Sequence, residues 1–270
     1  TLMNIIFGHY LPDSGSVKFK GEHIPVGNTR EAINLGIGMV HQHFTLAENL
    51  SVLENIAIGN QSLFGFSIDF KEIENKIARI SSEFGFSVDP QAIISDLSIG
   101  EKQRIEIIKT LFGNCELVIL DEPTASLAPQ EVDKLFLIMK SMVKAGLGVI
   151  IISHKLDEIL RISDRIIVLR NGKLTGSMDK ANFDKSSLAE MIVGKKIVRP
   201  KKIKGKKVEK LMEVKGLNVS SNIGSPMGLS DINFELFGGE IHGIAGVSGN
   251  GQRAFAEVMA GHIRPDSGDL

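Results

Sequence analysis

The chain has 270 residues, which predicts about two domains, and its net charge of −1 excludes a chain that is strongly basic or acidic overall. With 43% hydrophobic and 23% charged residues it has enough apolar material for globular cores, and its apolar runs are far shorter than the ~18 residues that cross a bilayer. The one cysteine, Cys115, excludes a disulfide framework or a four-cysteine zinc site; we expect a reducing compartment and a thiol that fills the core.

Two segments near the ends of the chain repeat one motif. Residues 7–15 read FGHYLPDSG and residues 260–268 read AGHIRPDSG, with six identities at a constant offset of 253. Each copy predicts a helix closed by a glycine and then a Pro-Asp-Ser-Gly turn, followed in the first copy by a strand at Val17 and Phe19. The repeat indicates a duplicated domain, and the offset leads us to expect residues before Thr1 that correspond to 246–253.

Gln42 lies between two histidines in residues 39–44, MVHQHF. If this segment is a strand, His41 and His43 share one side and Gln42 points to the other, which disfavours a three-ligand zinc site. The segment from there to Ser98 is rich in Leu, Ile and Glu and contains a capping box at Ser51-Val-Leu-Glu. It predicts a helical insert.

Residues 97–104, LSIGEKQR, place Ser98 before a helix with Glu101 three residues later. This spacing is typical of a capping box and is explained by a well-capped helix alone. It also fits a helix N-terminus that offers Ser98 and the amide of Gly100 to a phosphate. The sequence leaves both interpretations open.

Two buried strands end in polar residues. Residues 117–120 lead into Asp121 and Glu122, which suit magnesium bound through water and the orientation or deprotonation of an attacking water; paired acids can instead cap the next helix. Residues 148–152 lead to His154, and although a lone histidine is more often structural, ligands bind at this end of such strands. Strands alternating with helices predict an α/β core with a mainly parallel sheet.

The second half begins with strand and turn signals. Residues 163–174 contain Arg-Asn-Gly-Lys, a hairpin signal. Residues 195–210 then hold nine Lys or Arg against one Glu, without aromatics or helical periodicity, which favours a solvated linker over a nucleic-acid or lipid patch. Residues 211–240 predict short alternating strands.

Residues 246–253, GVSGNGQR, have the frame of a phosphate-binding loop between an apolar strand at 241–245 and a helix. Gln252 replaces the usual lysine and Arg253 the usual Ser or Thr, so the residues match the motif only in part. A strand-to-helix turn without a ligand is the alternative. We expect its phosphate-contacting residues to be Gly246, Gly249, Gly251 and Gln252.

These motifs, in this order, resemble the ATP-binding subunits of ABC transporters over essentially the whole chain. The resemblance implies an α/β, P-loop NTPase-type ABC ATPase core with a helical insert that touches the permease, followed by the beginning of a second similar lobe. It implies ATP and Mg²⁺ as cofactors. It assigns the Q-loop to Gln42, the signature motif to residues 97–104, the metal to Asp121 and Gln42, the catalytic glutamate to Glu122 and the switch histidine to His154.

Two lobes with a degenerate second loop resemble the tandem ATPases of bacterial sugar and nucleoside importers, and the HQHF and GNGQ strings resemble the purine-nucleoside type. This implies two transmembrane permease subunits, indirectly a solute-binding lipoprotein, no nucleic acid, and a peripheral place on the cytoplasmic face of the membrane.

The expected domains are a first lobe lacking its phosphate loop (1–193), a basic linker (194–210) and the N-terminal part of a second lobe (211–270). The 270 residues alone are then expected to be inactive. A soluble ABC ATPase of translation or DNA repair and a non-hydrolysing structural half are the alternatives.

The sequence departs from the family pattern at two motifs. Ile99 and Glu101 replace a Gly and a Gln of the usual signature, which leaves Ser98 and Gly100 to contact phosphate. Ala128 stands where the family usually has an aspartate that communicates between sites. This puts coupling between ATP sites through that loop in question.

Overall fold

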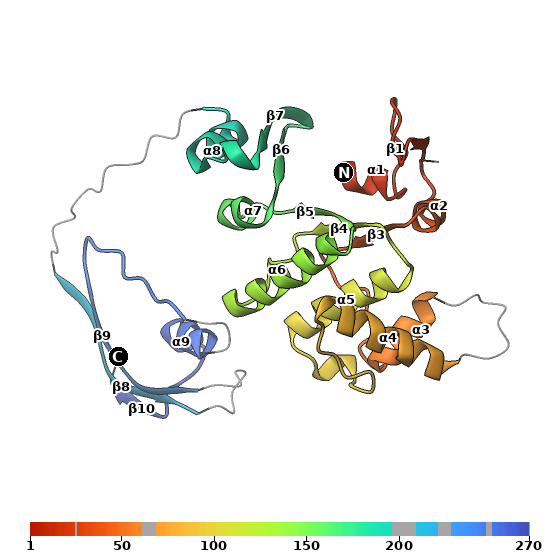
Figure 1. Ribbon diagram of the computed structural model, residues 1–270. Helices are drawn as coiled ribbons and strands as arrows, with labels where there is room; N and C mark the ends of the chain where they lie inside the picture. The colour runs from red at the N-terminus through yellow and green to blue at the C-terminus, as the bar shows by residue number, and fades with distance from the viewer. Residues whose placement is uncertain (25, 61–68, 196–208, 221–227, 247–249, 270) are drawn as a thin grey trace. The chain divides into compact units, whose positions relative to one another are not determined.

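The computed structural model in Figure 1 describes residues 1–24, 26–60, 69–195, 209–220, 228–246 and 250–269. The chain forms two compact units, residues 1–197 and 198–270, which divide within the basic segment. The expected linker lies almost entirely outside the described residues. Lys210, which was expected to end it, is already the first residue of a strand.

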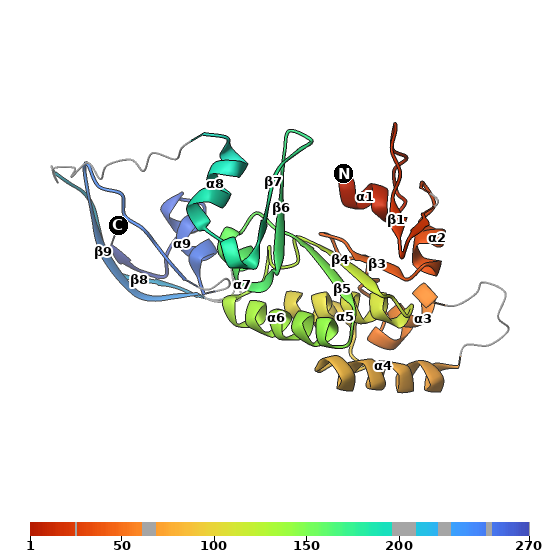
Figure 2. The same cartoon turned by 45° about the horizontal axis from the view of Figure 1, so that its top comes forward.

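A three-stranded parallel sheet forms the centre of the first unit, in the order β3 (Ile37–Val40), β4 (Leu117–Asp121), β5 (Gly148–Ile152). Val118 and Leu120 of β4 belong to a large apolar core with α5 (Ile99–Phe112) and α6 (Pro129–Lys144), whereas Ile119 packs with residues of α2 (Thr29–Asn34) and of the segment around α1 (Leu2–Ile6). Figure 2 shows α5 and α6 on one side of the sheet and α1 and α2 on the other. This confirms the predicted α/β core.

The predicted helical insert is present between β3 and α5. It contains α3 (Val52–Asn60), α4 (Phe70–Phe84) and a short 3₁₀ helix, η1 (Ile94–Asp96), and the part of the insert over 61–68 is outside the described residues. The buried residues of α4 recur every three or four positions, as expected for a helix with one face on a core. The capping box before α3 is also confirmed, because Ser51 and Glu54 exchange hydrogen bonds of 2.8 and 3.2 Å.

Shorter elements complete the first unit. Those not yet named are β1 (Lys18–Phe19), β2 (Glu22–His23), α7 (Leu156–Ile162), β6 (Arg165–Arg170), β7 (Lys173–Asp179), η2 (Lys180–Asn182) and α8 (Lys185–Val193). Strands β6 and β7 form the predicted hairpin. Its turn residues Asn171 and Gly172 have φ of 50° and 73°, the left-handed pair that a tight hairpin turn requires.

The second unit contains an antiparallel sheet in the order β10 (Ser267–Asp269), β8 (Lys210–Val219), β9 (Leu229–Phe237), together with α9 (Gln252–Met259). Val214, Leu217 and Val219 lie in its core with Val258, as predicted, but the predicted alternation is interrupted between Val214 and Leu217, where the register of β8 against β9 shifts. The predicted strand at 241–245 is wrong. Within the described residues that segment pairs with no other strand, and a strand cannot form without a partner for its backbone groups.

Cys115 is partly buried against the core on the α5 and α6 side of the sheet, as expected for a thiol that fills space. Burial raises its pKa from 9.0 to about 11. Because the thiolate is the reactive form, we expect alkylation of the folded chain at pH 8 to be about a hundredfold slower than that of the urea-unfolded chain. Timed iodoacetamide labelling followed by mass spectrometry measures this; equal rates would contradict the burial of Cys115.

No helix among the described residues is both long and apolar enough to cross a membrane.

Candidate functional site

The carboxyl ends of β3, β4 and β5 bring the predicted ATP-site residues of the first unit to one edge of the sheet. Gln42 follows β3 by two residues, Asp121 ends β4 with Glu122 directly after it, and His154 follows β5 by two residues. The strands are parallel and adjacent, so their ends lie side by side. Residues separated by more than a hundred positions therefore share one site.

Glu122 and His154 are in direct contact. The Nδ1 atom of His154 lies 2.9 Å from Oε1 of Glu122; the Glu122 side chain is 17% exposed and that of His154 74%. The backbone N–H of Glu122 donates to the carbonyl of Ile152 at 2.9 Å, which joins the ends of β4 and β5. Glu122 also has a φ of 49°, a left-handed conformation that is uncommon for such a side chain and is concentrated at functional sites.

The second carboxylate oxygen of Glu122 is buried and has no hydrogen-bond partner within the described part of the chain. Glu122 lines a cavity of about 160 Å³ together with Gln42 and Gln103, and Nε2 of Gln103 is likewise buried without a partner among the described residues. A buried polar atom that is left unpaired is costly, so such atoms indicate a ligand or ordered water. Both unpaired atoms therefore belong to residues that line the cavity, one of them to the Glu122 that contacts His154.

These residues fit an ATP–Mg²⁺ site. Proteins hold Mg²⁺ with one or two carboxylates together with substrate phosphates. Asp121 supplies a carboxylate at the strand end, and the unpaired oxygen of Glu122 suits a water or hydroxyl donor. Among the described residues no group of three or more His, Cys, Asp or Glu is placed to hold a metal.

Gln42 does not lie on a strand, so the expected alternation of its flanking histidines is wrong. Strand β3 ends at Val40, and the chain then turns off the sheet toward α5. His41 packs against the rings of Phe7 and His9, with centroids 6.0 and 5.3 Å away. Burial, and to a lesser extent the neighbouring His9, lower the pKa of His41.

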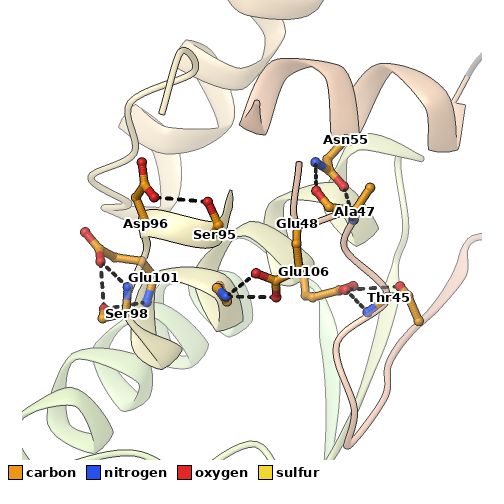
Figure 3. A network of polar contacts seen from close by, with 10 residues as sticks. Thr45, Ala47, Glu48, Asn55, Ser95, Asp96, Ser98, Glu101 and Glu106 are labelled. Carbon is orange, nitrogen blue, oxygen red and sulfur yellow. Dashed lines mark hydrogen bonds and ion pairs between the residues drawn. The ribbon is translucent and has the colours of Figure 1, made fainter. Parts of the chain in front are cut away.

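Helix α5 begins with the predicted capping box, which Figure 3 shows from close by. The Ser98 hydroxyl donates to a Glu101 carboxylate oxygen at 2.7 Å, and the Glu101 N–H donates back to that hydroxyl at 3.3 Å. Capping is therefore confirmed. A phosphate contact of Ser98 and Gly100 stays a prediction.

Glu131 is a residue of this region that the sequence analysis missed. A Cβ atom on Gly100 would overlap its carboxylate, which also accepts the N–H of Ala128 at 3.1 Å. Ala128, the position where the family usually has an aspartate, is the N-cap of α6 and has no side chain for that role. Glu131 instead accepts the backbone N–H at the start of α6, and its close approach to Gly100 joins positions 31 apart, for which the sequence holds no local signal.

A second set of residues that the sequence did not indicate joins the segments on either side of the Glu122–His154 contact. The buried Thr124 donates its hydroxyl to Glu158, and Lys155 donates to the Thr124 carbonyl at 2.7 Å while lying 3.3 Å from the Glu158 carboxylate. These contacts join the turn after β4 to the start of α7. They fix the two segments that carry Glu122 and His154, and the separation of 31 and 34 positions leaves no local signal in the sequence.

In the second unit the described parts of the glycine-rich loop flank the start of α9. Gly251 is the N-cap, with a φ of 87°, and Gln252 is the first residue of the helix. Gly246 lies so close to the Gln252 amide that a Cβ there would overlap it, and Gly249 lies outside the described residues. Arg253 pairs with Glu257 at 2.8 Å. A phosphate-binding role for this loop stays a prediction.

A family model described as ABC transporter matches residues 1–125. The whole chain is 40% identical to a nucleoside import ATP-binding protein of Lactococcus lactis subsp. cremoris (strain MG1363) and 38% identical to a guanosine import ATP-binding protein of Bacillus subtilis (strain 168). It covers 53% of each, so the chain spans about half the length of the curated relatives it matches.

Solved structures agree with the family match. A nucleotide-free ATP-binding cassette from an ABC transporter aligns with a TM-score of 0.59 and 25% identity over 66% of this chain and 74% of that one. An ATP-binding cassette of an ABC transporter in its ADP conformation gives the same score and identity over 72% of this chain and 82% of the other. The chain therefore contains an ABC transporter domain, matched over residues 1–125, and has the fold of ABC ATP-binding cassettes.

Proposed function

We propose that the whole protein hydrolyses ATP with Mg²⁺ to drive import of nucleosides or simple sugars through membrane permeases. The contact between Glu122 and His154, beside Gln42 at the edge of the parallel sheet, carries the proposal. The relatives at 40% and 38% identity are named for nucleoside and guanosine import, which favours nucleosides. The same names favour transport over the translation or DNA-repair alternative.

In this proposal each site residue of the first unit has a separate role in phosphoryl transfer. Bound ATP–Mg²⁺ supplies the reactive phosphorus and neutralises developing charge. Glu122 orients a water and accepts its proton, since it is the carboxylate residue among those that line the cavity, and one of its oxygens has no partner within the described residues. His154 contacts the other oxygen of Glu122, Asp121 at the end of β4 would hold the metal, and Gln42 lines the same cavity.

We infer that the partners are two permease subunits and, indirectly, a solute-binding lipoprotein, at the cytoplasmic face of the membrane. Residues 1–193 form the first lobe, the basic segment from residue 194 to residue 209 the linker, and residues 210–270 the start of a second lobe. Gln252 brings no positive charge to phosphate where a lysine is usual, so the site built on residues 246–253 hydrolyses more slowly.

Uptake by liposomes that contain the whole protein and its permeases tests this function. We expect ATP to drive accumulation of labelled guanosine or ribose, and a non-hydrolysable ATP analogue to give none. The translation or repair alternative instead predicts no uptake and co-sedimentation with ribosomes or duplex DNA, and that result would overturn the proposal.

A further inference from the structure

Glu158 uses its carboxylate for a contact outside its own helix. It is the third residue of α7, a position from which a glutamate often accepts the N–H of the residue that caps the helix. Here the cap residue Lys155 donates its N–H to the Ser153 hydroxyl oxygen at 3.0 Å, and the Glu158 carboxylate instead accepts the hydroxyl of Thr124. Capping of α7 therefore does not account for this glutamate.

Three contacts join Thr124, Lys155 and Glu158, and we call them the Thr124 attachment. Oε2 of Glu158 accepts the Thr124 hydroxyl, Nζ of Lys155 donates to the Thr124 carbonyl at 2.7 Å, and the same Nζ lies 3.3 Å from Oε1 of Glu158. Thr124 is buried, and the side chains of Glu158 and Lys155 are 18% and 34% exposed. Hydrogen bonds to charged groups are strong, and partly buried pairs are screened less than exposed ones. The attachment thus holds both the backbone and the side chain of Thr124.

The Thr124 attachment lies two residues from the left-handed backbone of Glu122. Such a conformation is unfavourable for a non-glycine residue, and it persists only where the surrounding structure fixes it. On one side, the Glu122 N–H donates to the Ile152 carbonyl at 2.9 Å. On the other side, Thr124 is held by Lys155 and Glu158. These two fixed points keep Glu122 in the conformation that directs its carboxylate to His154.

His154 depends on the same attachment. Its side chain is 74% exposed, so surrounding side chains do little to fix the ring. The position of the ring then follows that of the backbone, and the next residue, Lys155, is attached to Thr124. One set of contacts therefore positions both members of the Glu122–His154 pair.

We propose that Glu158 is a positioning residue for ATP hydrolysis, which acts through Thr124 and Lys155 to keep Glu122 and His154 in contact. This inference rests on the proposed function, in which Glu122 accepts the proton of the attacking water. A small misplacement of a catalytic group can cost on the order of a hundredfold in rate. Glu158 makes no contact with nucleotide in this role, so its loss lowers kcat and leaves the KM for ATP nearly unchanged.

Steady-state kinetics of variants of the whole protein test this role. We expect Glu158→Ala to lower kcat about tenfold or more, with the KM for ATP within about twofold of the parent. Glu158→Gln keeps an acceptor oxygen for the Thr124 hydroxyl and should recover most of the loss. Asp157→Ala is the matched control, because it removes a carboxylate from the same turn of α7. The Asp157 side chain is 78% exposed and pairs with Lys185, so kcat should stay within about twofold.

A double-mutant cycle between Glu158→Ala and Thr124→Val separates positioning from a general loss of stability. Both variants remove the same hydrogen bond, so the double variant should have about the kcat of the slower single variant. Thr124→Ser keeps the hydroxyl and should keep most of kcat. The measurements are made well below the unfolding midpoint and per folded molecule, where a loss of stability alone does not change kcat.

If Glu158→Ala does not fold, Glu158→Met combined with Thr124→Val replaces both partners by apolar groups of similar size, which costs little stability. This pair should show the same loss of kcat. Parental kcat in the pair, effects that multiply in the cycle, or an equal loss in Asp157→Ala would overturn the inference alone. A parent that does not turn over ATP at all would overturn the proposed function as well.

Discussion

Replacement of Glu122 by glutamine in the whole protein is expected to lower steady-state ATP turnover about a hundredfold or more. The amide keeps the size of the carboxylate and can still contact His154, but it cannot accept a proton from water. Removal of a general base or of a charge at a phosphoryl-transfer site costs roughly 10²–10⁴-fold. ATP binding, measured by equilibrium titration with a fluorescent analogue, should stay within about twofold because no phosphate contact is lost.

Glu116→Gln is the matched control for this experiment. Glu116 precedes β4, at the opposite end from Glu122; its side chain is 55% exposed and pairs with Lys20 at the surface. The same chemical change there should leave turnover within about twofold, since exposed ion pairs contribute little. A Glu122→Gln protein that kept half or more of its activity would show that the working site does not depend on the first lobe.

The sequence predicted the site residues whose place follows from strand order. Asp121, Glu122 and His154 follow strongly apolar runs, and adjacent parallel strands must end at the same edge. This rule predicts that the three residues lie close together, even when their side-chain contacts are unknown. Local signals, such as the capping boxes and the Asn-Gly turn, were equally readable because their partners are three residues apart or fewer.

The residues that hold the site in place were not predictable in this way. Glu106 accepts the N–H of Thr45 from 61 positions away, and Thr124 and Glu158 are 34 apart, so only the packing of helices on the sheet brings them together. The strand expected at 241–245 failed for a related reason. An apolar run indicates burial, but a strand also needs a neighbour to accept and donate its backbone hydrogen bonds.

The largest stability effect is expected at Ile119, in the middle of β4. Its side chain is 0% exposed and packs on the face of the sheet opposite α5 and α6, together with Phe7, Ile24, Ala32, Ile37 and Met39. Ile119→Ala should lower the free energy of unfolding by about 2–5 kcal/mol, because it removes apolar contacts and leaves a cavity. Denaturant unfolding followed by circular dichroism measures the change.

Ile167→Ala in β6 removes the same atoms from a side chain that is 52% exposed, so it should cost less than about 1 kcal/mol. Ile119 lies two positions before Asp121 on the same strand. Because its replacement lowers stability, ATP turnover should be lost at a lower temperature. The turnover of the molecules that stay folded should change little, because Ile119 is not a site residue. A loss of stability at Ile119 no greater than at Ile167 would mean that β4 is not buried on both faces. In that case the packing of Ile119 would not be what holds β4, and with it Asp121 and Glu122, in position.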